Sequence, residues 1–455
     1  MRVNHPLIIG LLLFMLAARG AGAQMPEAGT AAPIPPAVAA SGAGIEPAAI
    51  PLDLRTSLEW TLARNPDLIA QRQNLEVSEA ALELARHFPT SLNPTVTVDV
   101  RPWVFGPPPG GGLDHPIPLV NVTWAQPIEL GHRTGIRTAI AQAAYTQTRW
   151  TILQAELTTL VETYRDHQTA LYRRAKLEVA RQLYEHNERL LESLGRQVEA
   201  NRAPVADLVL AGVESQATRQ VWESARQEYQ VALADLRRQM GIPEYATSVE
   251  PSGQLLIPHL EPNQEEAQLL RIALESHPQV HAAEAQAACS QAALELAQAD
   301  RIPISSIGPV YERNEAADTF YGVVWSTPVP LLNAGGPLVR QRESEHHRDC
   351  TALAQLRDKV TAQVKATLVK WQQIQRAVER TEGGIEAIRG QAARMERLYA
   401  AGQTDVVKLL QVRDRLIEAE NARLDVLWQA TQAYAELLNS VGSTTLLGSL
   451  APKQP

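Results

Sequence analysis

Proline is absent from two very long stretches of this sequence, residues 128–203 and 338–451. Because proline is the residue that most strongly breaks a helix, each stretch has room for a helix of unusual length. The sequence also lacks a glycine-rich phosphate loop, a nucleophile elbow and a zinc-binding helix motif, so we expect neither an enzyme nor a cofactor. An excess of basic residues is missing too, since 42 Lys and Arg stand against 50 Asp and Glu, a formal net charge of −8. Nothing in this balance indicates a nucleic-acid partner.

The N-terminus has the order of charge, apolar core and small residues that is typical of a secretory signal. Arg2 precedes an apolar run over residues 7–16, and Ala21-Gly22-Ala23 follows. The run is too short to span a bilayer as a helix. We therefore expect a signal peptide at residues 1–23, with a retained anchor as the alternative, and a flexible leader rich in Pro and Ala at residues 24–51.

The rest of the sequence contains an internal duplication. The segment AALELA at residues 80–85 recurs letter for letter at residues 292–297, a spacing of 212. Later landmarks pair at a spacing of 201: Trp124 with Trp325, and Gly241 with Gly442. The fall in spacing gives the first half about 11 extra residues in one loop between residues 85 and 124. A duplicated framework predicts a quasi-symmetric, intertwined unit. Its expected parts are a first repeat at residues 52–241, a connector at 242–264, a second repeat at 265–442 and a C-terminal tail at 443–455.

Each repeat is expected to contain one very long helix and two shorter helices. A helix over residues 133–199 would reach roughly 100 Å at 1.5 Å per residue. Helices over residues 56–87 and 205–240 have nearly the same summed length, so they could stack end to end and pair with the long helix in antiparallel orientation. The corresponding helices of the second repeat are expected over residues 265–300, 337–400 and 405–441.

Apolar or small residues recur along the second long segment at steps that are mostly three or four residues. This spacing is the seam of a coiled coil. The seam positions are Leu353, Leu356, Val360, Val364, Thr367, Trp371, Ile374, Val378, Thr381, Ile385, Ile388, Ala392, Met395 and Tyr399.

Between the short and long helices, each repeat changes to an alternating pattern. Residues 95–101 alternate strictly between apolar and polar, and residues 119–124 nearly do, which predicts strands with one apolar and one polar face. A loop rich in glycine and proline at residues 105–112 holds the extra residues. The expected strands lie at about residues 94–104, 118–127, 304–313 and 319–328.

Four strands cannot close a barrel, and an open sheet edge is not viable in lipid. Several chains must therefore contribute to one barrel, and three chains would give twelve strands. Aromatic residues stand where an interfacial girdle is expected: Trp103, Trp124, Tyr321 and Trp325. The predicted fold class is mainly α, with duplicated long-helix hairpins and a small β-barrel contribution.

This combination resembles the TolC family of outer-membrane efflux ducts over residues 52–446. The features that carry the resemblance are residues 57–68 and their echo at 269–280, the strand exits at Pro127 and Pro328, and the turns at Ala200-Asn201 and Ala401-Gly402. The resemblance implies a homotrimer in the outer-membrane lipid of a Gram-negative cell, with a 12-stranded barrel and a long α-helical tunnel through the periplasm. It also implies a periplasmic adaptor (membrane fusion protein) and an inner-membrane pump as partners, and no catalysis.

Residues 127–133, with the sequence PIELGHR, are similar to a segment of CzcC-like members of that family, which serve heavy-metal resistance pumps. His132 departs from the second glycine of that segment. The resemblance favours efflux of heavy-metal cations, with organic-molecule or drug efflux by the same fold as the alternative. Two other classes stay open at this point: a soluble periplasmic coiled-coil adaptor or scaffold, and a metal-binding periplasmic protein.

The helix turns are the expected contact with the adaptor, by resemblance. Asn201 and Gly402 also suit a turn that needs a positive φ. The resemblance further implies acidic rings that narrow the tunnel near these turns, but Lys408 and Gln411 stand where the second repeat should be acidic. The expected adaptor contacts are Asn201, Arg202, Ala203, Ala401, Gly402, Gln403 and Thr404. The candidate gate residues are Asp207, Asp405, Lys408 and Gln411, with Asp414 nearby.

The two cysteines lie at similar depths on antiparallel helices. Cys289 is 11 residues before Asp300 and Cys350 is 13 residues after Pro337, which corresponds to about 17 and 20 Å at 1.5 Å per residue. In an oxidising compartment we expect a possible disulfide between them. Three pairs with the i, i+4 spacing of helical metal ligands are interpreted as solvated helix faces, because none has an evident third ligand. These pairs are His346 with Cys350, Glu343 with His347, and His277 with His281.

Overall fold

The structure is a computed structural model that describes residues 50–87, 89–101, 118–243, 249–255, 266–314, 318–401, 403–404 and 406–442. The expected signal peptide, nearly all of the leader, the loop at 105–112 and the C-terminal tail lie outside these residues. Trp103, Gly402 and Asp405 lie outside them as well.

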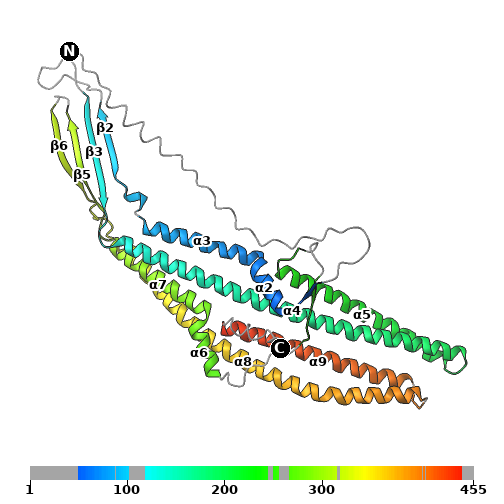
Figure 1. The fold of residues 1–455 in the computed structure, drawn as a ribbon. Helices are drawn as coiled ribbons and strands as arrows, with labels where there is room; N and C mark the ends of the chain where they lie inside the picture. The colour runs from blue at the N-terminus through cyan, green and yellow to red at the C-terminus, as the bar shows by residue number, and fades with distance from the viewer. Residues whose placement is uncertain are drawn as a thin grey trace.

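One order of elements occurs twice. Figure 1 shows the four-stranded sheet at one end of an elongated molecule and the turns of the two long hairpins at the other. The first set is α2 (Leu54–Arg64), α3 (Pro66–Arg86), the short 3-10 helix η1 (Thr90–Leu92), β2 (Thr95–Arg101), β3 (Leu119–Ile128), α4 (Arg133–Glu199) and α5 (Val205–Gln239). The second set is α6 (Glu266–Ser276), α7 (Pro278–Ala299), β5 (Ser305–Arg313), β6 (Thr319–Ser326), α8 (Gly336–Ala400) and α9 (Val406–Val441).

The long helices and the strands confirm the sequence-based expectation, but the two short helices next to the strands do not. The helix expected over residues 56–87 is broken at Asn65, and the helix expected over 265–300 is broken at His277. Each break is followed by a proline, which has no N–H to donate and starts a new helix. Asn65 caps that new helix, because its Oδ1 accepts a hydrogen bond from Leu68 N at 3.0 Å.

Both breaks lie against the C-terminal end of the last helix of their own repeat. Asn65 Nδ2 donates to the carbonyl of Gln239 at 2.8 Å. Gly241, with φ +65°, lies against the backbone at this break, and Gly442, with φ +71°, lies against His277. A side chain at either glycine would be strained and would collide with the break. The landmark pair spaced by 201 residues therefore marks where each repeat closes on itself.

A small parallel sheet joins the leader to the connector, which the sequence-based expectation lacked. Strand β1 (Ile50–Leu52) pairs with β4 (Val249–Pro251). Leu52 is fully buried in a cluster with Leu236 and Met240. Strand β1 thus includes Ile50 and Pro51, which belong to the segment expected to be leader.

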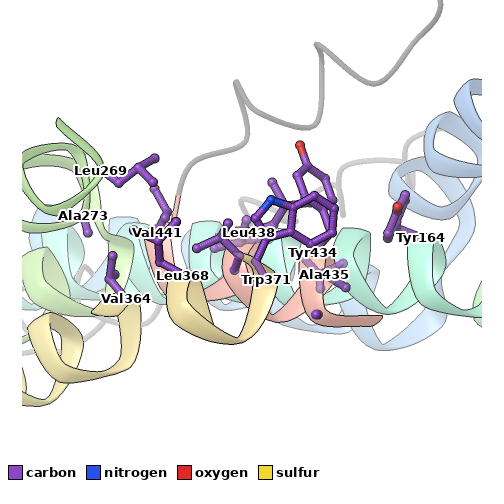
Figure 2. Packing of buried hydrophobic residues seen from close by; sticks show 14 of the residues in the cluster. Tyr164, Leu269, Ala273, Val364, Leu368, Trp371, Tyr434, Ala435, Leu438 and Val441 are labelled. Atoms are coloured by element: carbon purple, nitrogen blue, oxygen red, sulfur yellow. The ribbon is translucent and has the colours of Figure 1, made fainter. Parts of the chain in front are cut away.

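The main core lies where the two repeats pack on one another. Trp371 of α8 and Tyr434 of α9 have ring centroids 5.3 Å apart, and Tyr164 of α4 packs edge-on to Tyr434 at 6.1 Å. Figure 2 shows Trp371 and Tyr434 close to Leu438, with Tyr164 to one side of them. The expected seam of α8 is confirmed at its buried positions, which are Val360, Val364, Trp371, Val378, Ile385 and Ala392.

Neighbour contacts give the helices a fixed lateral order. Near the turns the order is α5, α4, α9, α8, and near the sheet it is α3, α4, α7, α8. The sheet has the order β2, β3, β5, β6 with every pair antiparallel. The molecule is therefore a layer with two long edges, one formed by β2, α3 and α5 and the other by β6 and α8.

Candidate functional site

The four-stranded sheet has one face that is apolar on all four strands. Val96, Val98 and Val100 of β2 are paired with Trp124, Val122 and Val120 of β3, so all six side chains lie on one face. The face continues across β5 and β6 through the pairs Ile307 with Trp325, Pro309 with Val323, and Tyr311 with Tyr321. The opposite face is polar on β2 and β3 and mixed on β5 and β6, and it carries Thr95, Thr97, Asp99, Asn121, Thr123, Val310, Glu312, Phe320 and Val324.

The apolar face is exposed to a degree that is unusual for a folded chain. The β2 valines keep between 50% and 60% of their accessible surface, Trp325 keeps 69% and Tyr321 keeps 82%. Contiguous exposed apolar surface of this kind marks contact with a membrane or with another protein. Trp124, Tyr321 and Trp325, expected in an interfacial girdle, all lie on this face.

The junction between the two repeats depends on a glycine that sequence reasoning missed. Gly308 of β5 lies so close to the Trp124 carbonyl of β3 that a Cβ atom there would overlap with it. Only glycine permits this approach of two backbones. The neighbouring Pro309 has no N–H to donate to the ladder of hydrogen bonds between strands. A proline inside a strand is the sequence signal that could have pointed to this irregular position.

The strand exit at residues 128–133 also connects the repeats. Arg133 is only 3% exposed, and its Nη2 donates to the carbonyls of Ala299, at 2.8 Å, and Ile302. Its Nε lies 3.3 Å from Asp300 Oδ1. Carbonyls at the end of α7 have no partner within the helix, so Arg133 of the first repeat caps a helix of the second. This role was not predicted, because its partners are backbone atoms distant in sequence.

His132, which departs from the second glycine of the CzcC-like segment, has a left-handed conformation with φ +54°. Glycine would adopt that conformation without strain, so the departure changes the side chain and keeps the turn. Glu129 forms an ion pair with Arg137 and accepts a hydrogen bond from Thr134 at 3.1 Å. The exit is therefore fixed by polar contacts within the chain.

The other strand exit has a different surface. Val329, Leu331 and Leu332, between β6 and α8, are 67%, 85% and 102% exposed. Gly335 supplies the left-handed residue before α8, with φ +77°. Nothing in the described part of the chain covers these apolar side chains.

The two hairpin turns close in the same manner. Asn201 has φ +57°, which confirms the expected positive φ. Arg202 N donates to the Gln197 carbonyl at 2.7 Å, and Gln403 N donates to the Leu398 carbonyl at 2.9 Å. These six-to-one bonds are the helix-ending pattern that a left-handed residue permits. Of the expected adaptor contacts, Asn201, Arg202, Ala401 and Gln403 are exposed, and Ala203 and Thr404 are half-buried.

An apolar cluster holds the two hairpins together behind their turns. Val406 and Leu410 of α9 pack with Leu190, Leu194 and Ala211 of α4 and α5. Among the candidate gate residues, Lys408 and Gln411 are exposed on α9. Asp207 is half-buried at the start of α5, and its charge adds to burial in raising the pKa of Tyr399. The nearby Asp414 carboxyl has a pKa raised by burial and by Glu418.

The expected disulfide is absent from the structure, in which Cys289 and Cys350 are both free thiols. The predicted depths were reasonable, but the faces differ. Cys289 Sγ donates to the Ile140 carbonyl of α4 at 3.8 Å, whereas Cys350 is exposed on α8. On α7, side chains that contact α8 include Gln286 and Ser290, which hydrogen-bond Asp349 and His346.

A polar cavity of about 460 Å³ lies where α4 and α5 meet α9. Asp166 of α4 lines it, and burial, together with Asp235 and Glu162, raises the pKa of this carboxyl to about 6. Arg165 and Arg238 also line the cavity. The contact between the repeats is therefore polar where α4 and α5 meet α9.

Among the described residues, no three His, Cys, Asp or Glu side chains converge as metal ligands. None of the described helices is both long and apolar enough to cross a membrane.

Comparison with known proteins supports the fold. The family model for outer membrane efflux proteins matches residues 269–443. None of the curated proteins matches the sequence. Among solved structures, the outer-membrane channel OprN is 18% identical with a TM-score of 0.70, over 86% of this chain and 89% of that chain.

Two further solved structures have the same fold. The CmeC outer-membrane channel of Campylobacter jejuni is 12% identical with a TM-score of 0.68, over 86% of this chain and 85% of that chain. The open state of the MtrE outer-membrane channel of Neisseria gonorrhoeae is 16% identical with a TM-score of 0.66, over 86% of this chain and 89% of that chain. The described chain thus has the fold of these outer-membrane channels.

Proposed function

We propose that this protein is the outer-membrane channel of a tripartite efflux system and that three copies enclose one tunnel. The observation that carries the proposal is the four-stranded sheet, whose apolar face is exposed and whose outer strands β2 and β6 each have one edge unpaired within the described chain. Unpaired backbone groups are too costly in lipid, so the sheet is stable there only when the edges of neighbouring copies pair. Twelve strands from three copies would close a barrel.

Strand direction is compatible with that closure. Adjacent strands in the chain alternate in direction, so β6 of one copy and β2 of the next would meet antiparallel. The helical layer has the same two edges, because α3 and α5 lie on the side of β2, and α8 lies on the side of β6. Head-to-tail contact along both levels generates a closed ring when the rotation closes. Exposed Val205, Val209 and Val213 recur every four residues on the outer helix α5 and suit burial in such a contact.

The turns of the hairpins are the proposed contact with a periplasmic adaptor, which connects the channel to an inner-membrane pump. They lie at the end of the molecule farthest from the sheet (Figure 1). Arg202 and Gln403 are exposed there and have no conformational reason to be polar. Asp207, Lys408 and Gln411 are the proposed gate residues among those described, and Asp405 completes the set in sequence.

Heavy-metal cations are the favoured substrate, and organic molecules are the alternative. The preference rests on the local similarity of residues 127–133 to CzcC-like proteins. Within that segment Arg133 joins the two repeats and Glu129 fixes the strand exit inside the first repeat, so we place the choice of substrate with the pump. A deletion strain tested against a panel of metal salts and organic drugs would separate the two alternatives.

The first experiment is fractionation of the mature protein followed by a measurement of its size in detergent. We expect it in the outer membrane and, after extraction, as a trimer by light scattering. A soluble monomer would contradict the proposal and support the class of soluble periplasmic scaffolds. The variant Val98→Asp places a charge on the apolar face, and we expect it to lower the membrane-bound fraction. Thr97→Asp, on the polar face of the same strand, is the matched control.

A further inference from the structure

We propose that α3 of one copy packs on α8 of the next copy in the way that α7 packs on α4 inside the chain. The partner of both surfaces is therefore a second copy of this chain. The contact places Val77 of one copy against Gln341 of the next, and Ile69 against Thr351. It rests on the proposed function, which brings copies together edge to edge and leaves open which residues of α3 and α8 meet.

The duplication preserves helix packing as well as sequence landmarks. Arg72 of α3 forms an ion pair with Glu156 of α4 at 2.7 Å. The equivalent positions, at spacings of 212 and 201, are Glu284 of α7 and Arg357 of α8, which also form an ion pair at 2.7 Å. The charges are exchanged and the two positions still meet. Contacts in one repeat are therefore a guide to contacts at the equivalent positions of the other.

Helix α4 packs on α7 as well as on α3. Trp150 of α4 stacks on His281 of α7, with ring centroids 4.3 Å apart. Farther toward the sheet, Cys289 Sγ of α7 donates to the Ile140 carbonyl of α4 at 3.8 Å. Helix α8 has α7 as its neighbour within the layer, and its other side lies at the outer edge. That edge is equivalent to the side of α4 that contacts α7.

The equivalents of these four contact residues lie at the two edges of the layer and are exposed. Gln341 and Thr351 of α8 are equivalent to the two α4 residues, and both are exposed. Val77 and Ile69 of α3 are equivalent to the two α7 residues, and they are 68% and 42% exposed. All four residues of the interior contact are half-buried. Each edge thus has one half of a contact that is complete inside the chain.

Helix α3 has an apolar stripe suited to such a contact. Ile69, Val77 and Leu84 follow one another at steps of eight and seven residues, close to the repeat that keeps side chains on one face of a packed helix. Leu84 is 71% exposed. Leu68 and Leu82 are buried on a different side of the same helix. The stripe therefore requires a further helix, and α8 of the next copy supplies it.

The sheet gives the same relation between copies. Strand β3, the second strand of the first repeat, pairs with β5, the first strand of the second repeat. The equivalent pair is β6 with β2 of the next copy. Unlike edges meet in both levels, so the contact is head-to-tail and can generate a ring. A contact between like edges would instead bring α3 against α3.

Cysteine cross-linking tests the contact in the full-length protein. Cys289→Ser and Cys350→Ser first remove the native thiols, and Val77→Cys with Gln341→Cys then introduces the test pair. The protein would be extracted in detergent, treated with a short bifunctional thiol reagent and separated on a denaturing gel. We expect linked dimers and trimers of the chain, with several-fold more product than either single-cysteine variant gives. Light scattering and circular dichroism of each variant show whether it assembles and keeps its helices.

A second pair and a matched control make the test specific. Ile69→Cys with Thr351→Cys should also give linked dimers and trimers. For the control, Val77→Cys is combined with the native Cys350, which is exposed on α8 nine residues beyond Gln341, about 13 Å along the helix. We expect several-fold less product from this combination.

Three results in an assembled trimer would overturn the contact and leave the proposed function standing. They are no product from either pair, equal product from the Cys350 control, and product from Val77→Cys alone, which would require like edges to meet. A soluble monomer would contradict the proposed function and the contact together.

Discussion

The two strand exits occupy equivalent places in the duplicated framework and have opposite surfaces. The exit at Arg133 lies in the middle of the layer, where its polar groups bind the other repeat. The exit at Leu331 and Leu332 lies at the outer edge, where its apolar side chains are exposed. The two exits therefore share the strand-to-helix turn of the duplicated framework. Their side chains differ in polarity according to whether the exit lies inside the layer or at its edge. Interior junctions are formed within one chain, whereas apolar side chains at the outer edge are left uncovered by the described residues.

The largest expected effect comes from a side chain that keeps the backbones of β3 and β5 apart at the junction of the two repeats. Gly308→Val should prevent β3 and β5 from pairing, because its side chain would overlap with the Trp124 carbonyl. We expect little or no assembled protein in the outer membrane, measured by immunoblotting of membrane fractions.

Gly383→Ala is the matched control, because no atom lies within 4 Å of a Cβ at that position of α8. The change should stabilise the helix by about 0.5–1 kcal/mol. Normal assembly of the Gly308→Val variant would contradict this prediction, because it would show that β3 and β5 can move apart without loss of the assembled protein.

The next effect concerns the cap that joins the repeats. Arg133→Met removes the side-chain donor to the carbonyls of Ala299 and Ile302, of which Ala299 keeps the hydrogen bond from Ile302 N, and we expect a loss of roughly 2 kcal/mol in the free energy of unfolding. Thermal unfolding in detergent measures the change. Arg55→Met is the control, since Arg55 forms an ion pair with Glu59 that is exposed to solvent and should contribute little to stability. Equal losses in both variants would mean that Arg133 has no special role.

Much of this architecture follows from periodic patterns in the sequence. The features that the sequence-based prediction missed do not follow from such patterns. The helix at Arg133–Glu199 was predicted with the bounds that the structure has, and the strand at Thr95–Arg101 lies within the predicted range 94–104, because alternation and the absence of proline act locally. The break at Asn65 is marked in the sequence by Asn65-Pro66, a signal for a helix start that the predicted helix over residues 56–87 did not use.

The remaining differences arise from contacts that are distant in sequence. Strands of three residues, such as β1 and β4, are too short for a pattern to show. For the cysteines, counting residues along a helix gave their depth but not their rotation about the axis. The partners of Arg133 are carbonyl groups, and every residue has one. These features required the two repeats to be placed against each other.

The outer edge should respond through assembly and not through folding of the chain. Leu331→Ser with Leu332→Ser removes two exposed leucines, and burial of a leucine contributes about 1.5–3 kcal/mol. We expect a lower trimer fraction on dilution in detergent, measured by light scattering, with unchanged helix content. Leu130→Ser is the control, because Leu130 is also exposed but lies at the interior exit. A similar loss of trimer in the control would remove the distinction between interior and edge.

The smallest expected effect concerns Asp166, and it tests whether the polar groups in the cavity between the repeats have favourable partners. Asp166 has a pKa of about 6 in the folded chain, above the ordinary 3.8, so its ionisation is less favourable when folded. The folded chain should therefore lose stability as pH rises from about 4 to 6, and the loss should persist above pH 6. The carboxyl is partly reached by solvent, which reduces the expected loss to about 1 kcal/mol. Asp166→Asn should remove this pH dependence and raise the thermal midpoint at pH 7, and Asp207→Asn, near the turn, serves as the comparison. If Asp166→Asn lowers stability at pH 7, then the surrounding groups stabilise the Asp166 carboxylate in the cavity. The polar groups there would then be paired as well as those around Arg133.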